Sequence, residues 1–115
     1  MAFSKSGSNP AERRRYRRVD RRVPVDMHLE SLGYDITGET QNLSLVGTYC
    51  KVDRPIPEMT QLMMVLNLPS DQVECEGTVV RSIPDPSSSN SHHLAIFFNE
   101  ISESAKQKLN TFIEA

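Results

Sequence analysis

Short stretches in which apolar and polar residues alternate recur along this chain, and turn-forming residues bound them. In the clearest stretch, 23–29, Val23, Val25, Met27 and Leu29 fall on one face, and Asp26 and His28 fall on the other. A period of two places one set of side chains on each face of an extended chain, so this stretch is predicted to be a half-buried strand. Five further segments are predicted as strands: 36–43, 47–52, 61–68, 73–82 and 93–99.

One segment near the end of the chain has helical periodicity. Ser102 is a suitable N-cap, Glu103 suits the first turn, and apolar residues follow on one face, namely Ile101, Ala105, Leu109, Phe112 and Ile113. The predicted fold is therefore mainly β: a six-stranded antiparallel β-barrel with a C-terminal α-helix, because closure removes exposed strand edges. We expect the helix to lie against the barrel wall or to close one open end.

A cluster of arginines, 12–22, precedes the first predicted strand. It holds seven of the thirteen Lys and Arg residues against two acids, a formal charge of +5, while the remainder, with six basic and thirteen acidic residues, carries −7. A guanidinium fork matches phosphate and the guanine edge, so the cluster indicates a phosphate- or nucleotide-bearing ligand. A solvated, disordered basic tail is the alternative. The seven are Arg13, Arg14, Arg15, Arg17, Arg18, Arg21 and Arg22.

The length of 115 residues predicts a single domain. Residues 1–11 are small and polar and are predicted to be disordered, leaving 12–115 as the domain with a flexible N-terminal arginine-rich arm. No apolar run approaches the roughly 18–20 residues of a membrane span, and the N-terminus lacks the apolar centre of a secretory signal. We therefore expect a cytoplasmic protein without membrane insertion.

The sequence offers no arrangement typical of an enzyme. It has no nucleophile–base spacing, phosphate loop or metal-ligand array, so we expect no catalysis, metal or cofactor. His28, His92 and His93 are predicted to be solvated surface residues. The five methionines are predicted to fill the core, and the cysteines are interpreted as small buried hydrophobes.

A second motif, Asn42-x-Ser44-x-x-Gly47, lies between the second and third predicted strands. Taken alone, it is better interpreted as a tight turn than as a ligand site. Together with Arg14-x-x-x-Arg18, however, it resembles the PilZ domain family, the bacterial receptors of cyclic di-GMP. The resemblance covers about residues 12–114 and extends to the segments 22–25 and 77–81. One departure is Ala95, where that family often has glycine.

The resemblance implies a site for cyclic di-GMP and no cofactor. Arg14 and Arg18 would clamp guanine and phosphate, and Asn42 and Ser44 would contact the ligand from the barrel. Gly47 would keep that surface open. Two further arginines are assigned by hypothesis: Arg13 would add a contact that permits a stacked pair of ligands, and Arg81 would reach the same face.

The arm also predicts a mechanism. Seven arginines repel one another, so we expect the arm to stay loose until an anion binds and orders it over the barrel. A protein partner would then recognise the ordered state, and the resemblance to the PilZ family implies control of motility, adhesion or exopolysaccharide. Two rivals remain: a small barrel that binds nucleic acid through the arm, disfavoured by the acidic body, and a PilZ-like adaptor that binds no ligand.

Overall fold

A computed structural model describes residues 16–115 of the chain. The predicted disorder of 1–11 and the positions of Arg13 and Arg14 lie outside these described residues. The elements are β1 (Pro24–Leu29), β2 (Tyr34–Leu43), β3 (Gly47–Val52), β4 (Gln61–Asn67), β5 (Gln72–Pro84), β6 (His92–Glu100) and α2 (Glu103–Glu114).

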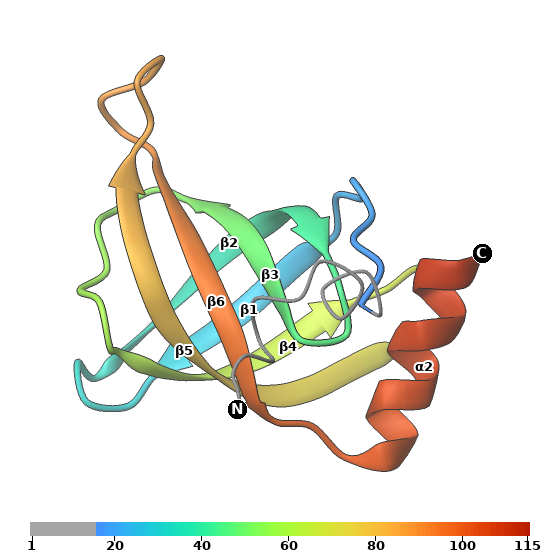
Figure 1. Cartoon of the computed structure of the whole chain (residues 1–115). Helices are drawn as coiled ribbons and strands as arrows, with labels where there is room; N and C mark the ends of the chain where they lie inside the picture. The colour runs from blue at the N-terminus through green and yellow to red at the C-terminus, as the bar shows by residue number, and fades with distance from the viewer. Residues whose placement is uncertain (1–15) are drawn as a thin grey trace, which may run out of the picture.

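The six strands form a closed barrel in the order β1-β2-β3-β6-β5-β4 (Figure 1). Every neighbouring pair is antiparallel, and pairing of β1 with β4 completes the ring. The predicted fold class is therefore confirmed. A closed barrel has no free edge, so each of the six strands is paired with a neighbour on both sides.

The period-two pattern fills the barrel interior. In β1, Val25, Met27 and Leu29 are buried, while the residues between them are exposed. Cys50 and Cys75 are both buried and free, in agreement with their interpretation as small buried hydrophobes. Burial raises the pKa of each thiol to about 12, so both stay protonated at neutral pH.

Helix α2 lies at one end of the barrel, beside the first residues of β5 (Figure 1). Its N-cap is Ser102, whose hydroxyl accepts a hydrogen bond of 3.1 Å from the Ala105 amide. Leu109 and Ile113 are fully buried and belong to the same hydrophobic core as the strands. The amphipathic face predicted from the sequence is thus the face that packs.

The prediction that the methionines fill the core is wrong for two of them. Met27 and Met64 are buried, but Met63 is 47% exposed and Met59 is 73% exposed, so the methionines do not all fill the core. The strand period explains Met63, because it occupies an outward position of β4 between two inward ones.

The prediction that all three histidines are solvated at the surface is also wrong for His93. His28 is exposed as predicted, whereas the imidazole of His93 is only 20% exposed. Within the described residues, the Nδ1 atoms of His92 and His93 are buried without a hydrogen-bond partner. The ring of His93 is largely covered because it stacks on Tyr49, with ring centroids 5.3 Å apart.

Among residues 16–115 there is no helix long and apolar enough to cross a membrane.

Candidate ligand-binding site

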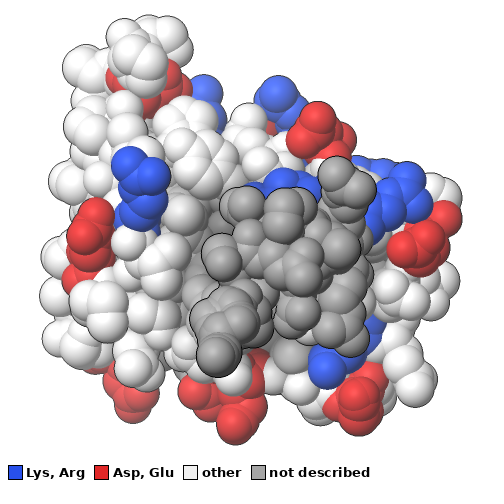
Figure 2. All heavy atoms as spheres, viewed as in Figure 1, with Lys and Arg blue, Asp and Glu red and all other residues white. Residues whose placement is uncertain are grey.

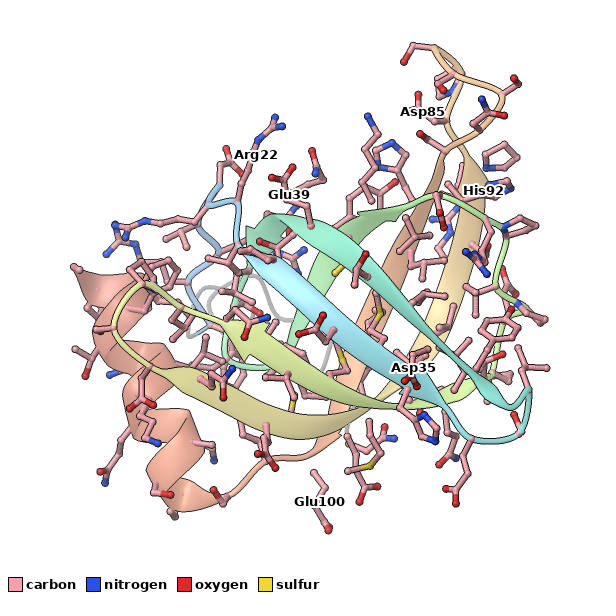
Figure 3. The ribbon with its side chains drawn as sticks, turned by 180° about the vertical axis from the view of Figure 1, so that it is seen from behind. Arg22, Asp35, Glu39, Asp85, His92 and Glu100 are labelled. Carbon is pink, nitrogen blue, oxygen red and sulfur yellow. The ribbon has the colours of Figure 1, made fainter. Side chains whose placement is uncertain are left out.

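The described half of the arginine arm is attached to the barrel. The backbone of Val19 exchanges two hydrogen bonds of 2.9 Å with that of Leu43, at the end of β2. Arg22 lies 3.8 Å from Glu39 of the same strand, and Figure 3 shows both side chains at that end of the barrel. The expectation of a loose arm is therefore wrong for residues 19–22.

Arg18 points at the barrel and meets the second predicted motif. Its Nη1 donates a hydrogen bond of 2.9 Å to the side-chain oxygen of Asn42. By contrast, Arg17 lies 3.3 Å from the carboxylate of Glu114. Because the partner of Arg18 within the described residues is a neutral amide, its positive charge is left for an anion.

Irregularities in two strands orient the polar residues of this region. The register of β2 shifts between Thr40 and Asn42, and that of β5 shifts between Val79 and Arg81. Thr40 and Val79 are fully buried, whereas Asn42 and Arg81 reach the surface. A β-bulge re-aims a side chain in this way, and bulges are common beside functional sites.

Asn42 and Arg81 are the ends of one row of residues across four strands. Asn42 pairs with Tyr49, Tyr49 pairs with Ala95, and Ala95 pairs with Arg81. Paired residues of antiparallel strands share a face, so all four lie on the outer wall formed by β2, β3, β6 and β5. We call these four residues, with Arg18 beside Asn42, the arginine row.

Sequence reasoning missed Tyr49 and Ala95 as members of this surface. Tyr49 occupies an outward position of β3, and its ring is stacked on His93 with an angle of 25° between the planes. An outward aromatic residue in the segment 47–52 was the available signal. Tyr49 gives the row a flat apolar surface between two cationic ends, which is an arrangement that a nucleobase can stack on.

The hairpin between β5 and β6 supports this stack. Asp85 Oδ2 lies 3.3 Å from His93 Nε2 and 3.7 Å from Lys51 Nζ. The Ser87 amide and hydroxyl both donate to Asp85 Oδ1. These hydrogen bonds, led by that of the amide, lower the pKa of Asp85 to about 2. The carboxylate therefore stays charged beside His93. Figure 3 shows Asp85 near the base of this hairpin.

The other two predicted motif residues are used inside the turn between β2 and β3. Ser44 is only 1% exposed; its hydroxyl accepts from the Val46 amide at 3.2 Å and donates to the Gly47 carbonyl at 3.3 Å. A Cβ on Gly47 would stand 2.4 Å from the carbonyl oxygen of Ile96. The structure thus brings Arg18 and Asn42 together and places Ser44 and Gly47 beneath them as supports.

The remaining predicted site residues are placed as follows. Arg81 is exposed at the far end of the arginine row, while Arg13 and Arg14 lie outside the described residues. Figure 2 shows this face of the molecule with Lys and Arg side chains in separate places, interspersed with Asp and Glu. The described residues contain no group of three His, Cys, Asp or Glu side chains that could hold a metal ion.

Together, the closed barrel, the cationic arm paired with its rim and the arginine row form a candidate surface for an anionic, ring-containing ligand. Comparison with protein families then identifies the chain more closely. The model of the PilZ domain matches residues 12–115, so the chain belongs to the PilZ domain family. Comparison with curated proteins gave no match.

Solved structures show the same fold. MotI/DgrA, the inhibitor of motility of Bacillus subtilis, superposes with a TM-score of 0.75 at 23% identity, over 88% of this chain and 49% of that one. The PilZ domain of YcgR from Escherichia coli with c-di-GMP gives 0.67 at 18% identity, over 89% of each chain. The MrkH–c-di-GMP complex of K. pneumonia gives 0.74 at 14%, over 88% and 51%. The chain thus spans about half the length of MotI and MrkH.

Proposed function

We propose that this chain is a receptor for cyclic di-GMP that binds the ligand along the arginine row. The observation that carries the proposal is the hydrogen bond of 2.9 Å between Arg18 and Asn42, which joins the two family motifs on the outer wall of the barrel. Family membership and the c-di-GMP complexes of YcgR and MrkH support the choice of ligand.

Each member of the row has a chemical task in this proposal. Arg18 binds a phosphate or the O6 and N7 atoms of guanine, and Asn42 holds the guanidinium in position while offering its own amide to the ligand. Tyr49 stacks on a guanine ring. Arg81 neutralises charge at the far end of the row, and Arg14 covers the ligand from the arm.

Ser44 and Gly47 act indirectly. With its hydroxyl committed to the turn, Ser44 fixes the backbone that leads from Asn42 into β3. Gly47 allows β3 to approach Ile96 of β6, so it sets the spacing of the wall. Both residues therefore shape the binding surface.

Binding would change the part of the molecule that a partner can recognise. The ligand would neutralise the arm and fix its first arginines over the barrel, creating a surface made of arm, ligand and wall together. A protein partner that recognises this surface would control motility, adhesion or exopolysaccharide. Arg13 would add a contact to a second, stacked ligand, so two ligands per chain are expected.

Isothermal titration calorimetry with cyclic di-GMP tests the proposal. We expect saturable binding to the wild type and a loss of roughly 10–100-fold in affinity for Arg18→Ala, since a charged hydrogen bond contributes about 1.5–3 kcal/mol. Asn42→Ala should weaken binding too, because it removes the acceptor that orients Arg18.

Arg22→Ala is the matched control, because it removes an arm charge that is paired with Glu39 and lies away from Asn42. It should retain most of the affinity. Equal losses in Arg18→Ala and Arg22→Ala would mean that only net charge matters and would contradict the assigned contact. If the wild type releases no heat with cyclic di-GMP but binds a single-stranded oligonucleotide, the nucleic-acid alternative is correct.

A further inference from the structure

A second surface feature lies on the side of the barrel formed by β2, β1 and β4. Two adjoining hollows of about 580 and 530 Å³ share His28 and Met63 as lining residues. Strands β3 and β6, which carry Tyr49 and Ala95 of the arginine row, are toward the viewer in Figure 1, whereas β1 and β4 are in front in Figure 3, which is turned by 180°. The hollows are therefore on the opposite side from the proposed ligand site.

The strand register shows how the hollows are built. His28 pairs across the sheet with Asp35 on one side and with Met63 on the other. In the next outward row, Asp26 pairs with Val65, which pairs with Glu74. An apolar side chain of β4 thus occupies the centre of each row: His28 and Glu76 flank Met63, and Asp26 and Glu74 flank Val65.

The charges that line the hollows are strongly unequal. Arg54 is the one Lys or Arg among the described lining residues, and its guanidinium already lies 3.0 Å from a carboxylate oxygen of Asp53. The lining carboxylates are Asp26, Glu30, Asp35, Asp53, Glu74 and Glu76. We call the two hollows with this lining the acidic groove. Its field attracts cations and repels the phosphates of nucleic acids and anionic lipids.

Two exposed methionines give the acidic groove apolar contact points. Met63 lies where the hollows join, and Met59 lines the second one. Methionine side chains are flexible and polarisable, so they suit surfaces that bind other proteins. Both are among the larger exposed apolar side chains of residues 16–115.

The backbone of Met59 adds an independent observation. Its φ is +72°, in the left-handed region that favours glycine or asparagine. The Met59 amide donates to the Val79 carbonyl at 2.6 Å, and this bond holds the strained residue in place. A strained conformation that displays an exposed methionine costs stability without improving packing, which points to a role outside the core.

We propose that the acidic groove docks a cationic segment of a partner protein, with an apolar side chain of that segment placed against Met63 and Met59. Lys or Arg residues on either side of this apolar residue would meet the flanking carboxylates. The complementary charge excludes nucleic acid and anionic membrane as occupants. The proposal does not depend on cyclic di-GMP binding, since none of the groove residues belongs to the arginine row.

Fluorescence anisotropy with a synthetic probe tests the proposal. The probe is a fluorescein-labelled amphipathic peptide of sixteen residues composed of Leu and Lys, and its partner is the same peptide with Glu in place of Lys. We expect saturable binding of the Leu/Lys peptide by the wild type and none of the Leu/Glu peptide. Met63→Gln should weaken binding by roughly tenfold or more, as expected when a central apolar contact is lost.

Met59→Gly removes the side chain and relieves the backbone strain, so this variant should bind the peptide less well and unfold at the same or a higher temperature. Phe97→Gln is the matched control, because Phe97 is 52% exposed on β6, away from the groove. It should leave peptide binding unchanged. Equal affinity of the peptide for the wild type and both methionine variants would overturn the proposal.

Two further readouts separate the remaining explanations. Sedimentation of the protein alone should show a monomer; concentration-dependent association that is lost in Met63→Gln would assign the groove to a second copy and overturn the partner-protein assignment. Cyclic di-GMP should bind Met63→Gln as it binds the wild type. If Arg18→Ala lost cyclic di-GMP binding but kept peptide binding, the two sites would bind their ligands independently.

Discussion

Ser44 and Gly47 occupy one tight turn, and each is explained by a contact within the protein. The hydroxyl of Ser44 joins both sides of the turn, and Gly47 permits the close approach of β3 to Ile96. Both residues of the family motif therefore shape the backbone of this turn. At this scale, Arg18 and Asn42 are the residues that face outward and touch each other.

A methyl group at position 47 tests this interpretation. In Gly47→Ala, the new Cβ would stand 2.4 Å from a backbone oxygen of Ile96, which cannot rotate away. We expect a loss of about 1–3 kcal/mol in the free energy of unfolding, measured by urea denaturation.

Gly33→Asn is the comparison, because Gly33 has a φ of +76° and no atom within 4 Å of its Cβ position. Asparagine tolerates this conformation, so the variant should unfold close to the wild type. If Gly47→Ala were as stable as Gly33→Asn, the close approach would not be the reason for glycine at 47.

Among the elements, β2 and β5 connect the arginine row to the acidic groove. Asn42 and Arg81 lie in one half of each strand, while Asp35 and Glu74 lie in the other. Both strands are long enough to reach the two surfaces, and both are longer than predicted from the sequence. The predicted segments were 36–43 and 73–82, whereas the strands are Tyr34–Leu43 and Gln72–Pro84.

These differences have physical reasons. Pro84 lies beyond the predicted strand 73–82, but it pairs with His92 at the last position of β5, where a missing amide donor is tolerated. The alternation of apolar residues was enough to predict six strands, and helical periodicity was enough to predict the helix. Arg18 and Asn42 were assigned to one site only by the resemblance to the PilZ family. The alternation could not predict that Tyr49 and Ala95 complete a row with Arg81, because register and bulges depend on contacts between strands far apart in the sequence.

The hairpin between β5 and β6 should be sensitive to acid. The pKa of Asp85 is lowered to about 2 from an ordinary value of 3.8, mainly by the hydrogen bonds from Ser87. A lowered pKa in the folded state means that Asp85 stabilises the fold above its unfolded pKa and loses this effect as pH falls from about 4 to 2.

Thermal unfolding of the wild type and Asp85→Asn between pH 6 and pH 2 measures this effect. The wild type should have the higher Tm at pH 6, and the difference should shrink toward pH 2. A difference in Tm that stays constant over this range would show that the charge of Asp85 does not contribute.

Helix α2 and the arm stabilise each other. The last turn of α2 contains no basic residue of its own, although its free carbonyls attract a cation. Arg21 supplies one: its Nη2 donates to the carbonyl of Ala115 at 2.6 Å, and its guanidinium lies 4.9 Å from the ring centre of Phe112. Arg17 adds the contact with Glu114.

Removal of the Arg21 side chain should loosen this end of the helix. For Arg21→Ala we expect faster amide hydrogen exchange in the last turn of α2 and a stability loss of about 0.5–1 kcal/mol. Arg22→Ala should leave exchange in α2 unchanged, because its partner Glu39 is on β2. Unchanged exchange in both variants would contradict the proposed contact between arm and helix.

On the scale of the whole molecule, one small barrel carries two surfaces of different character. The arginine row lies on the β3 and β6 side and is completed by a cationic arm; the acidic groove lies behind it and is lined by carboxylates and methionines. The chain as a whole is close to neutral, with a formal charge of −2, so the separation of charge, rather than its sum, distinguishes the two faces.

The most direct test of the proposed receptor function is to follow the amide resonances of ¹⁵N-labelled protein during a titration with cyclic di-GMP. The account predicts saturable shifts along the arginine row, at Arg18, Asn42, Tyr49, Ala95 and Arg81, with little change at the acidic groove. Shifts confined to the acidic groove, or no shifts at saturating ligand, would contradict it.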